Sequence, residues 1–210
     1  MRQINAILRR ELIAYFSSPL AYIVITAFLL LQGLVFSLIV SLLSQPGEAA
    51  MTPLRLFFGG TIFFWFYLVI VPLITMRLVA EERRSGTIEV LLTAPVTEAQ
   101  VIIGKFLGAW IFYLVMWAPT LVYVYLLARS STIDLGPVAS SYLGVALVGM
   151  LYIGVGVFAS TLSRNQIIAA VLAFVALIML FSVGLVDLLL VSSSPLKPVI
   201  AYMNLWEHMD

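Results

Sequence analysis

The sequence has no cysteine and only one histidine, His208, among its 210 residues. The absence of cysteine excludes disulfide bonds, thiolate nucleophiles and cysteine-ligated metals, and a lone histidine excludes a histidine metal cluster. The patterns His-Glu-x-x-His and Gly-x-Ser-x-Gly are also missing. Without them the chain has no residues arranged for metal-assisted or serine-dependent hydrolysis, which argues against a membrane enzyme.

A nucleotide-binding loop is absent as well. Its pattern Gly-x4-Gly-Lys-Ser/Thr would need a glycine five residues before Gly104 and a hydroxyl residue after Lys105. Ala99 and Phe106 occupy those two positions. We therefore expect no cofactor on this chain, and any ATP that drives it must be hydrolysed by another polypeptide.

Charge is scarce. Charged residues make up 10% of the chain, and its net charge is only +1. Such a chain has no basic patch that could neutralise phosphates, so nucleic acid is excluded as a partner. Hydrophobic residues, in contrast, reach 63%, and the mean hydropathy is +1.13. A soluble domain of this size could not bury so much apolar surface, so membrane lipid must surround most of it.

Five apolar runs are each long enough to cross a bilayer, which takes about 20 helical residues. Helices are expected because an open set of strands would leave backbone groups without hydrogen bonds in lipid. The connections between the runs are short and polar, or carry Pro and Gly, and no internal repeat is evident. The predicted fold is therefore all-α, a single polytopic transmembrane helical bundle over residues 1–210. Its spans are expected at about 20–43, 54–76, 106–127, 140–162 and 166–191.

The distribution of Lys and Arg predicts the orientation, because positive charges concentrate in cytoplasmic loops. With a cytoplasmic N-terminus, eight of these residues lie inside and three lie outside. The inside set is Arg2, Arg9, Arg10, Arg77, Arg83, Arg84, Lys105 and Arg164, and the outside set is Arg55, Arg129 and Lys197. This bias predicts that the loop at 81–104 is cytoplasmic.

The first 18 residues have the pattern of an amphipathic helix that lies on the membrane surface. Apolar residues recur at helical spacing, polar residues occupy the other face, and Pro19 ends the segment. The apolar set is Ile4, Ile7, Leu8, Leu12, Tyr15 and Phe16, and the polar set is Arg2, Gln3, Asn5, Arg9 and Arg10. The alternative is that these residues serve only to orient the first span.

At the other end of the chain, residues 192–210 are partly apolar and include Trp206 and two prolines. This composition is typical of a short interfacial segment, here on the extracytoplasmic side. Because five spans leave the C-terminus outside, we expect a sixth span to follow Asp210 in the native polypeptide.

A charged segment beginning at Glu81 separates the second span from the third. The pair Ser85-Gly86 predicts a turn, after which a short helix can run from Thr87 until Pro95 stops it. Four of the five residues at 88–92 are aliphatic. We interpret them as an apolar ridge that fits a groove on a soluble partner. The alternative is an ordinary solvated loop.

The next helix is predicted to start at Thr97, because Thr97 and Gln100 have the spacing of a capping box. Gly104 and Gly108 follow one turn apart and permit a neighbouring helix to come close. Packing within one subunit is the preferred interpretation of these glycines, and a seam between two subunits is the alternative.

Taken together, these segments resemble the ABC-2 type permeases of ABC transporters, and most closely the branch for gliding motility and nitrous-oxide-reductase maturation. The charged segment matches in Glu82-Arg83-Arg84-Ser85-Gly86-Thr87-Ile88-Glu89-Val90-Leu91-Leu92-Thr93-Ala94-Pro95-Val96, followed by Gly104-Lys105. The ends match in Arg10-Glu11-Leu12, Tyr15-Phe16-Ser17-Ser18-Pro19 and Asn204-Leu205-Trp206-Glu207-His208.

The resemblance implies a coupling helix at about 86–92 that docks on a separate nucleotide-binding ATPase subunit. The docking residues it implies are Glu82, Arg83, Arg84, Gly86, Thr87, Ile88, Glu89, Leu91, Leu92 and Pro95. ATP and Mg²⁺ would be bound by that partner.

The resemblance further implies a bacterial inner-membrane location and a second permease subunit, identical or related, that pairs with this one. An extracytoplasmic auxiliary protein is compatible with such an assembly. The expected function is export of a substrate across the inner membrane. The alternative is mechanical or assembly work that ATP drives on an extracytoplasmic partner, without net transport.

Overall fold

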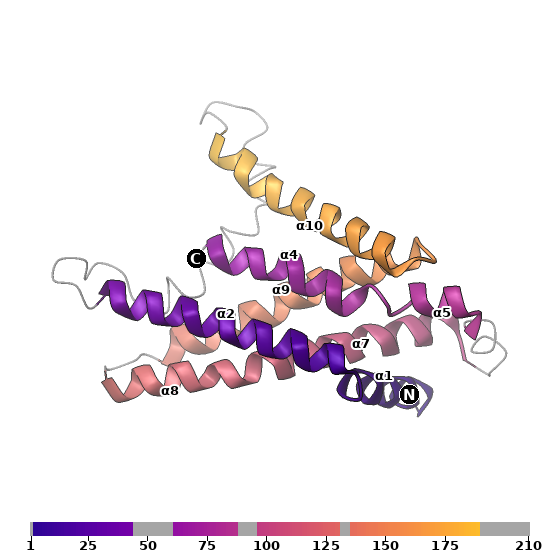
Figure 1. Ribbon diagram of the computed structural model, residues 1–210, viewed down its shortest axis with the longest axis horizontal. Helices are drawn as coiled ribbons and strands as arrows, with labels where there is room; N and C mark the ends of the chain where they lie inside the picture. Colours follow the sequence, from indigo (N-terminus) through magenta and orange to yellow (C-terminus); the bar gives the residue numbers. More distant parts are fainter. Residues whose placement is uncertain (1, 44–60, 88–95, 131–134, 190–210) are drawn as a thin grey trace.

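The computed structural model describes residues 2–43, 61–87, 96–130 and 135–189, and all its elements in these ranges are helical (Figure 1). In chain order they are α1 (Arg2–Phe16), α2 (Pro19–Leu43), α4 (Thr61–Thr75), α5 (Ala80–Ser85), α7 (Glu98–Trp117), the 3-10 turn η1 (Ala118–Thr120), α8 (Leu121–Ser130), α9 (Leu135–Thr161) and α10 (Gln166–Leu189). The predicted all-α fold is confirmed.

Three helical stretches of the described chain are long and apolar enough to cross a membrane: Pro19–Ser41, Glu98–Arg129 and Leu135–Thr161. Within α10, Gln166–Ser182 is a shorter apolar stretch. These lengths and compositions bear out the prediction of a helical membrane bundle. The predicted residues 54–60 of the second span and the predicted interfacial segment 192–210 lie outside the described residues.

The predicted third span, 106–127, lies inside a longer helical stretch formed by α7, η1 and α8. This stretch starts at Glu98, where the capping box is formed as predicted. Thr97 Oγ1 accepts from the Gln100 amide at 3.3 Å, and the Gln100 side chain accepts from the Thr97 amide at 3.2 Å. Near its middle, Pro119 has no amide hydrogen to donate, and one turn tightens into η1.

α9, which corresponds to the predicted fourth span, begins earlier than residue 140, where that span was expected to start. It starts at Leu135 and includes Pro137 in its first turn. A proline is tolerated there because the first amide groups of a helix have no intrahelical partner in any case. The proline that suggested a connecting loop is therefore part of the helix start.

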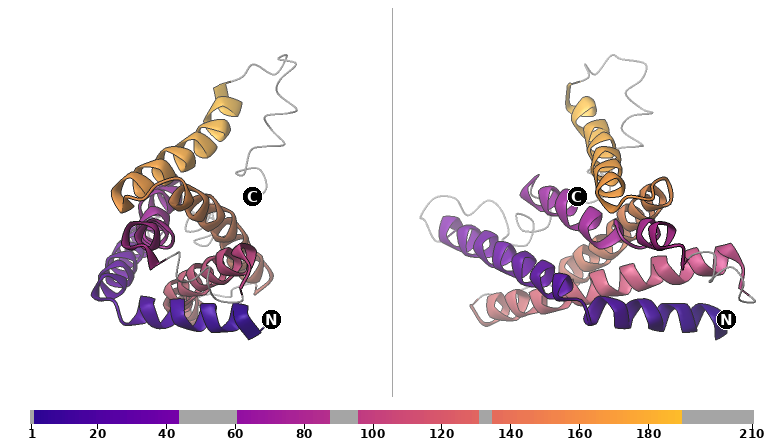
Figure 2. Two further views of the ribbon diagram at one scale, coloured as in Figure 1. Left: turned by 90° about the vertical axis from the view of Figure 1, so that its right-hand side faces the viewer. Right: turned by 45° about the vertical axis from the view of Figure 1, so that its right-hand side comes forward.

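α2, α4 and the stretch α7–α8 run in roughly the same direction, α10 slants away from them, and α1 lies across one end of the bundle (Figure 1 and Figure 2). α4 packs against α9 and α10, and α9 also packs against α7. The core between these helices is aromatic: the hydroxyls of Tyr67 and Tyr113 are 2.7 Å apart, and Tyr113 donates to the Val145 carbonyl at 3.0 Å. A Cβ on Gly149 would lie 2.3 Å from the Tyr113 ring, so only glycine fits beside it.

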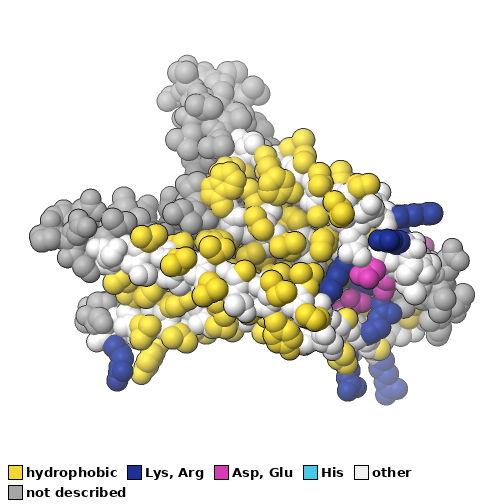
Figure 3. All heavy atoms as spheres, in the orientation of Figure 1, with side chains coloured by type: hydrophobic (Ala, Val, Ile, Leu, Met, Phe, Trp, Pro, Cys, Tyr) yellow, Lys and Arg dark blue, Asp and Glu magenta, His cyan; other side chains and the backbone are white. Residues whose placement is uncertain are grey.

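The outside of the bundle is apolar along its length and charged at one end (Figure 3). Leu30, Leu34 and Leu38 of α2 are 65%, 62% and 58% exposed, as expected for a surface that lipid covers. Lys, Arg and Glu side chains gather where α1, α5 and the first turns of α7 meet, which we name the charged end. Arg129, in the last turn of α8, lies at the opposite end.

α1 packs closely on the first half of α7 through the two glycines of that helix. A Cβ on Gly104 would lie 2.7 Å from Ile7 Cγ2, and a Cβ on Gly108 would lie 2.9 Å from Glu11 Cβ. Real side chains do not approach so closely, so the α1–α7 contact depends on the absence of a Cβ at both positions. This geometry supports the interpretation that these glycines serve packing within one chain.

We expect the substitution Gly104→Val to displace α1 from α7, because overpacking a tight contact costs about 1–3 kcal/mol. Trypsin should then cleave after Arg9 and Arg10 about tenfold faster, and the rate of cleavage in limited proteolysis measures the effect. Gly144→Val is the matched control, since a Cβ at Gly144 meets no atom within 4 Å. Equal cleavage of the two variants would contradict the packing argument.

Candidate functional site

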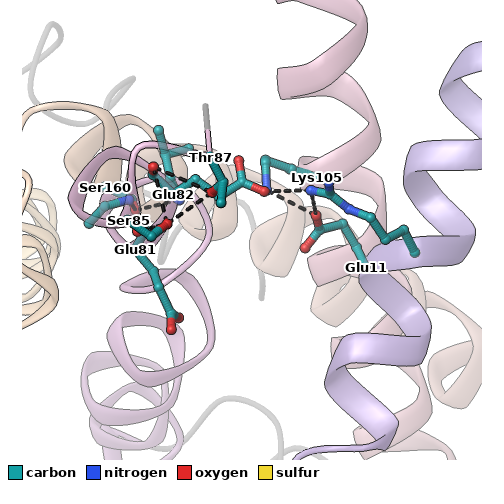
Figure 4. Close-up of polar contacts among 10 residues, drawn as sticks. Glu11, Glu81, Glu82, Ser85, Thr87, Lys105 and Ser160 are labelled. Atoms are coloured by element: carbon teal, nitrogen blue, oxygen red, sulfur yellow. Dashed lines mark hydrogen bonds and ion pairs between the residues drawn. The ribbon is translucent and has the colours of Figure 1, made fainter. Parts of the chain in front are cut away.

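Four charged side chains from three helices meet at the charged end (Figure 4). Lys105 Nζ of α7 lies 2.9 Å from Glu11 Oε1 of α1 and 2.9 Å from Glu82 Oε1 of α5. Arg10 Nη2 of α1 lies 3.0 Å from Glu11 Oε1 and also pairs with Glu82 Oε1. These four residues, named the ion-pair cluster below, join helices that are far apart in the sequence.

Most of the ion-pair cluster is withdrawn from solvent. The side chains of Lys105, Glu11 and Glu82 are 2%, 10% and 16% exposed. A charge at such a site is tolerated only when opposite charges surround it, and Lys105 has two carboxylates. Arg10 is half-exposed. Its burial lowers its pKa, but the hydrogen bonds and charges of Glu11 and Glu82 outweigh that effect and raise the pKa above its ordinary value.

α1 is fixed at the cluster by Tyr15, which lies one turn after Glu11. The Tyr15 hydroxyl donates to the Ile74 carbonyl at 2.8 Å, and its ring stacks on Phe112 with 4.7 Å between ring centres. Burial and the nearby Glu11 carboxylate raise the pKa of the phenol, although Arg77 opposes this shift. The phenol therefore stays protonated and keeps its hydrogen bond to α4.

α5 is positioned by Ser160 of α9. Its hydroxyl accepts from the amides of Val79 and Ala80, both at 3.1 Å, and donates to the Met76 carbonyl at 3.1 Å. Val79, the residue before α5, has no side chain that could cap the helix. Ser160 therefore supplies the cap from another helix and bridges the break between α4 and α5.

A comparison with known protein families decides the class of this chain. The family model described as "ABC-2 family transporter protein" matches residues 48–204. The chain belongs to the ABC-2 transporter family. No curated protein and no solved structure matches it. Membership makes the chain a permease component of an ABC transporter, which implies a nucleotide-binding partner, while the gliding-motility and nitrous-oxide-reductase branch stays a prediction.

The turn predicted at Ser85-Gly86 is formed. α5 ends at Ser85, and Gly86 follows it with a φ of 72°, in the left-handed region that glycine adopts at little cost. Ser85 donates to the Glu81 carbonyl at 2.9 Å, and its hydroxyl lies 2.9 Å from that of Thr87. A defined turn therefore precedes the segment for which the coupling helix is predicted.

The structure describes only part of the predicted docking set. Glu82 turns inward to the ion-pair cluster, whereas Arg83, Arg84, Gly86 and Thr87 are exposed. The remaining five residues, Ile88, Glu89, Leu91, Leu92 and Pro95, lie outside the described residues, so the apolar ridge and the coupling helix stay predictions.

Sequence reasoning did not foresee the ion-pair cluster or the cap from Ser160. In the cluster, Glu82 is 72 residues from Arg10 and Lys105 is 94 residues from Glu11, and at the cap Ser160 is 80 to 84 residues from its three partners. One local signal was available, because Glu11 lies one turn from both Ile7 and Tyr15 on the apolar face of α1. A carboxylate on such a face indicates a buried cation opposite it.

Proposed function

We propose that this chain is the membrane subunit of an ABC-2 exporter in a bacterial inner membrane. Its segment at 86–95 docks on a separate nucleotide-binding subunit, which binds ATP and Mg²⁺ and hydrolyses the ATP. A second permease subunit pairs with it to complete the pathway. Family membership supports the permease role, and the Lys and Arg count supports an orientation in which the charged end is cytoplasmic.

The observation that carries this proposal is the ion-pair cluster. Glu82 is four residues before Gly86 and lies on α5, the helix that leads into the docking segment. Through Lys105 and Arg10 it contacts both α7 and α1. A partner that displaces the segment therefore pulls on α7, which is part of a membrane-crossing stretch. The contact between Glu82 and Lys105 is direct and largely shielded from solvent, so a displacement of α5 is passed on to α7.

Single cysteines can test orientation and docking together, because the chain has none of its own. A cysteine at Ser85 is expected to be shielded from a membrane-impermeant thiol reagent in intact cells and to react in inside-out vesicles. Adding the nucleotide-binding subunit to those vesicles should protect it. Cysteines at Gln45 and Ser131 are the controls, and we expect them to react in intact cells.

The outcomes separate the parts of the proposal. If position 85 reacts in intact cells while positions 45 and 131 do not, the orientation is wrong. If position 85 reacts in inside-out vesicles equally well with and without the nucleotide-binding subunit, the docking segment lies elsewhere.

A further inference from the structure

The chain leaves the helical path between α4 and α5, although its sequence there favours a helix. α4 ends at Thr75 and α5 begins at Ala80 (Figure 1). The residues at 76–79 are Met, Arg, Leu and Val, and three of these four are among the stronger helix formers. Pro72 does not cause the break, because the helical bond from the Met76 amide to the Pro72 carbonyl is formed at 2.8 Å. A side chain that enters the backbone hydrogen-bond ladder is another common cause of such a break.

The Ser160 hydroxyl of α9 is inserted into one bond of this ladder. In a continuous helix the Ala80 amide would donate to the Met76 carbonyl, four residues earlier. Here the Ala80 amide donates to Ser160 Oγ, and Ser160 Oγ donates to the Met76 carbonyl, both at 3.1 Å. The hydroxyl therefore separates the two groups that would otherwise bond to each other.

The Tyr15 hydroxyl of α1 occupies the acceptor of a second bond. The Ile74 carbonyl would accept from the Leu78 amide in a continuous helix, but it accepts from the Tyr15 hydroxyl at 2.8 Å. The Leu78 amide donates instead to the Thr75 carbonyl at 3.1 Å, which is only three residues earlier. Two hydroxyls from two other helices thus take up backbone groups of the α4–α5 junction.

We propose that Tyr15 and Ser160 are positioning residues for the docking segment, because their hydroxyls keep α4 and α5 apart as two helices. The junction is buried: Ile74, Leu78 and Ala80 are 2%, 3% and 0% exposed. Without the two hydroxyls, its amides and carbonyls would lack partners away from water, which is strongly disfavoured. Closing the helical ladder satisfies these groups again, so residues 61–85 become one continuous helix.

The consequence for the docking segment follows from the position of α5. Glu82 lies on α5 and pairs with Lys105, and Gly86 directly follows this helix. Closing the ladder changes the direction of α5 relative to α4, so Glu82 moves away from Lys105 and the docking segment is re-aimed. Its alignment therefore depends on how α1 and α9 are placed against α4. This step rests on the proposed function, which assigns docking to residues 86–95.

Spin labels on the full chain measure whether the ladder closes, since the sequence has no cysteine of its own. Cysteines replace Val69 of α4 and Arg84 of α5, which are both exposed, and double electron–electron resonance in detergent gives the distance between the labels. In a continuous helix these positions are about 22 Å apart, at about 1.5 Å per residue. Tyr15→Phe with Ser160→Ala should replace the parent's distance with a narrow peak near that separation.

Ser160→Ala alone should add a second peak at the helical separation, which keeps the test valid if the double variant does not fold. Ser160→Thr retains a hydroxyl and should retain the parent's distance. Ser141→Ala is the matched control and should also retain it, because the Ser141 hydroxyl donates to the Pro137 carbonyl of its own helix.

Two results would overturn the proposal. If the double variant keeps the parent's distance, the break does not depend on the two hydroxyls. If its distribution is only broadened, the hydroxyls cap the start of α5 and the ladder does not close. No nucleotide-binding subunit takes part in these measurements, so their outcome is independent of the proposed function.

Discussion

Replacing Lys105 with methionine is expected to destabilise the protein by about 3–5 kcal/mol, the usual effect of removing one partner from a buried ion pair. Methionine fills a similar volume but leaves Glu11 and Glu82 facing each other without a cation between them, apart from the half-exposed Arg10. Thermal unfolding in detergent measures the loss. Arg83→Met is the control, because Arg83 is exposed and its removal should change stability by about 0.5 kcal/mol or less.

A triple variant that also removes both carboxylates distinguishes the electrostatic contribution of Lys105 to stability from its packing contribution. Adding Glu11→Gln and Glu82→Gln to Lys105→Met removes the uncompensated carboxylates, so most of the lost stability should return. If the triple variant is as unstable as the single one, the contribution of Lys105 is packing, and the electrostatic account of the cluster is contradicted.

The double substitution Leu91→Asp with Leu92→Asp is expected to abolish copurification with the nucleotide-binding subunit. If these residues occupy a groove on that partner, two unpaired carboxylates there would weaken binding by several kcal/mol, of the order of 4 kcal/mol or more. The variant should still insert into the membrane, because the segment lies outside the predicted spans. Recovery of the ATPase with the permease is the measurement.

The control for this loss of copurification is a variant in which residues 91 and 92 stay apolar. Leu91→Met with Leu92→Met has similar volume and no charge, so the partner should still copurify. If the aspartate variant recovers as much ATPase as the methionine variant, residues 91 and 92 do not form the docking surface.

Features with a local signal were predictable from the sequence. The long apolar runs predicted the bundle, Thr97 and Gln100 predicted the start of α7, and Ser85-Gly86 predicted the turn after α5. Each depends on residues that are adjacent or one turn apart. Pro137 was misleading because a proline in a first helical turn and a proline in a loop look the same in sequence.

For the ion-pair cluster, the only local signal among the described residues is Glu11 on the apolar face of α1, and it does not identify the partners. Charge counting assigned Arg10 and Lys105 to a cytoplasmic surface, and nothing in their immediate neighbours shows that they meet. Their meeting depends on the close approach of α1 to α7 at Gly104 and Gly108, which is a property of the folded bundle. The family resemblance implied Glu82 as a docking residue, and the structure adds that its side chain turns inward to Lys105.

The central claim is that a displacement of the docking segment reaches α1 and α7 through Glu82. The most direct test uses a fluorophore on a cysteine at Arg9, an exposed position of α1, in the complex with the nucleotide-binding subunit. Trapping nucleotide with ATP and vanadate should change the emission in the parent protein and in Glu81→Gln, whose carboxylate is exposed. In Glu82→Gln the ATPase should remain bound, but the change in emission should largely disappear. The same change in all three proteins would contradict the claim.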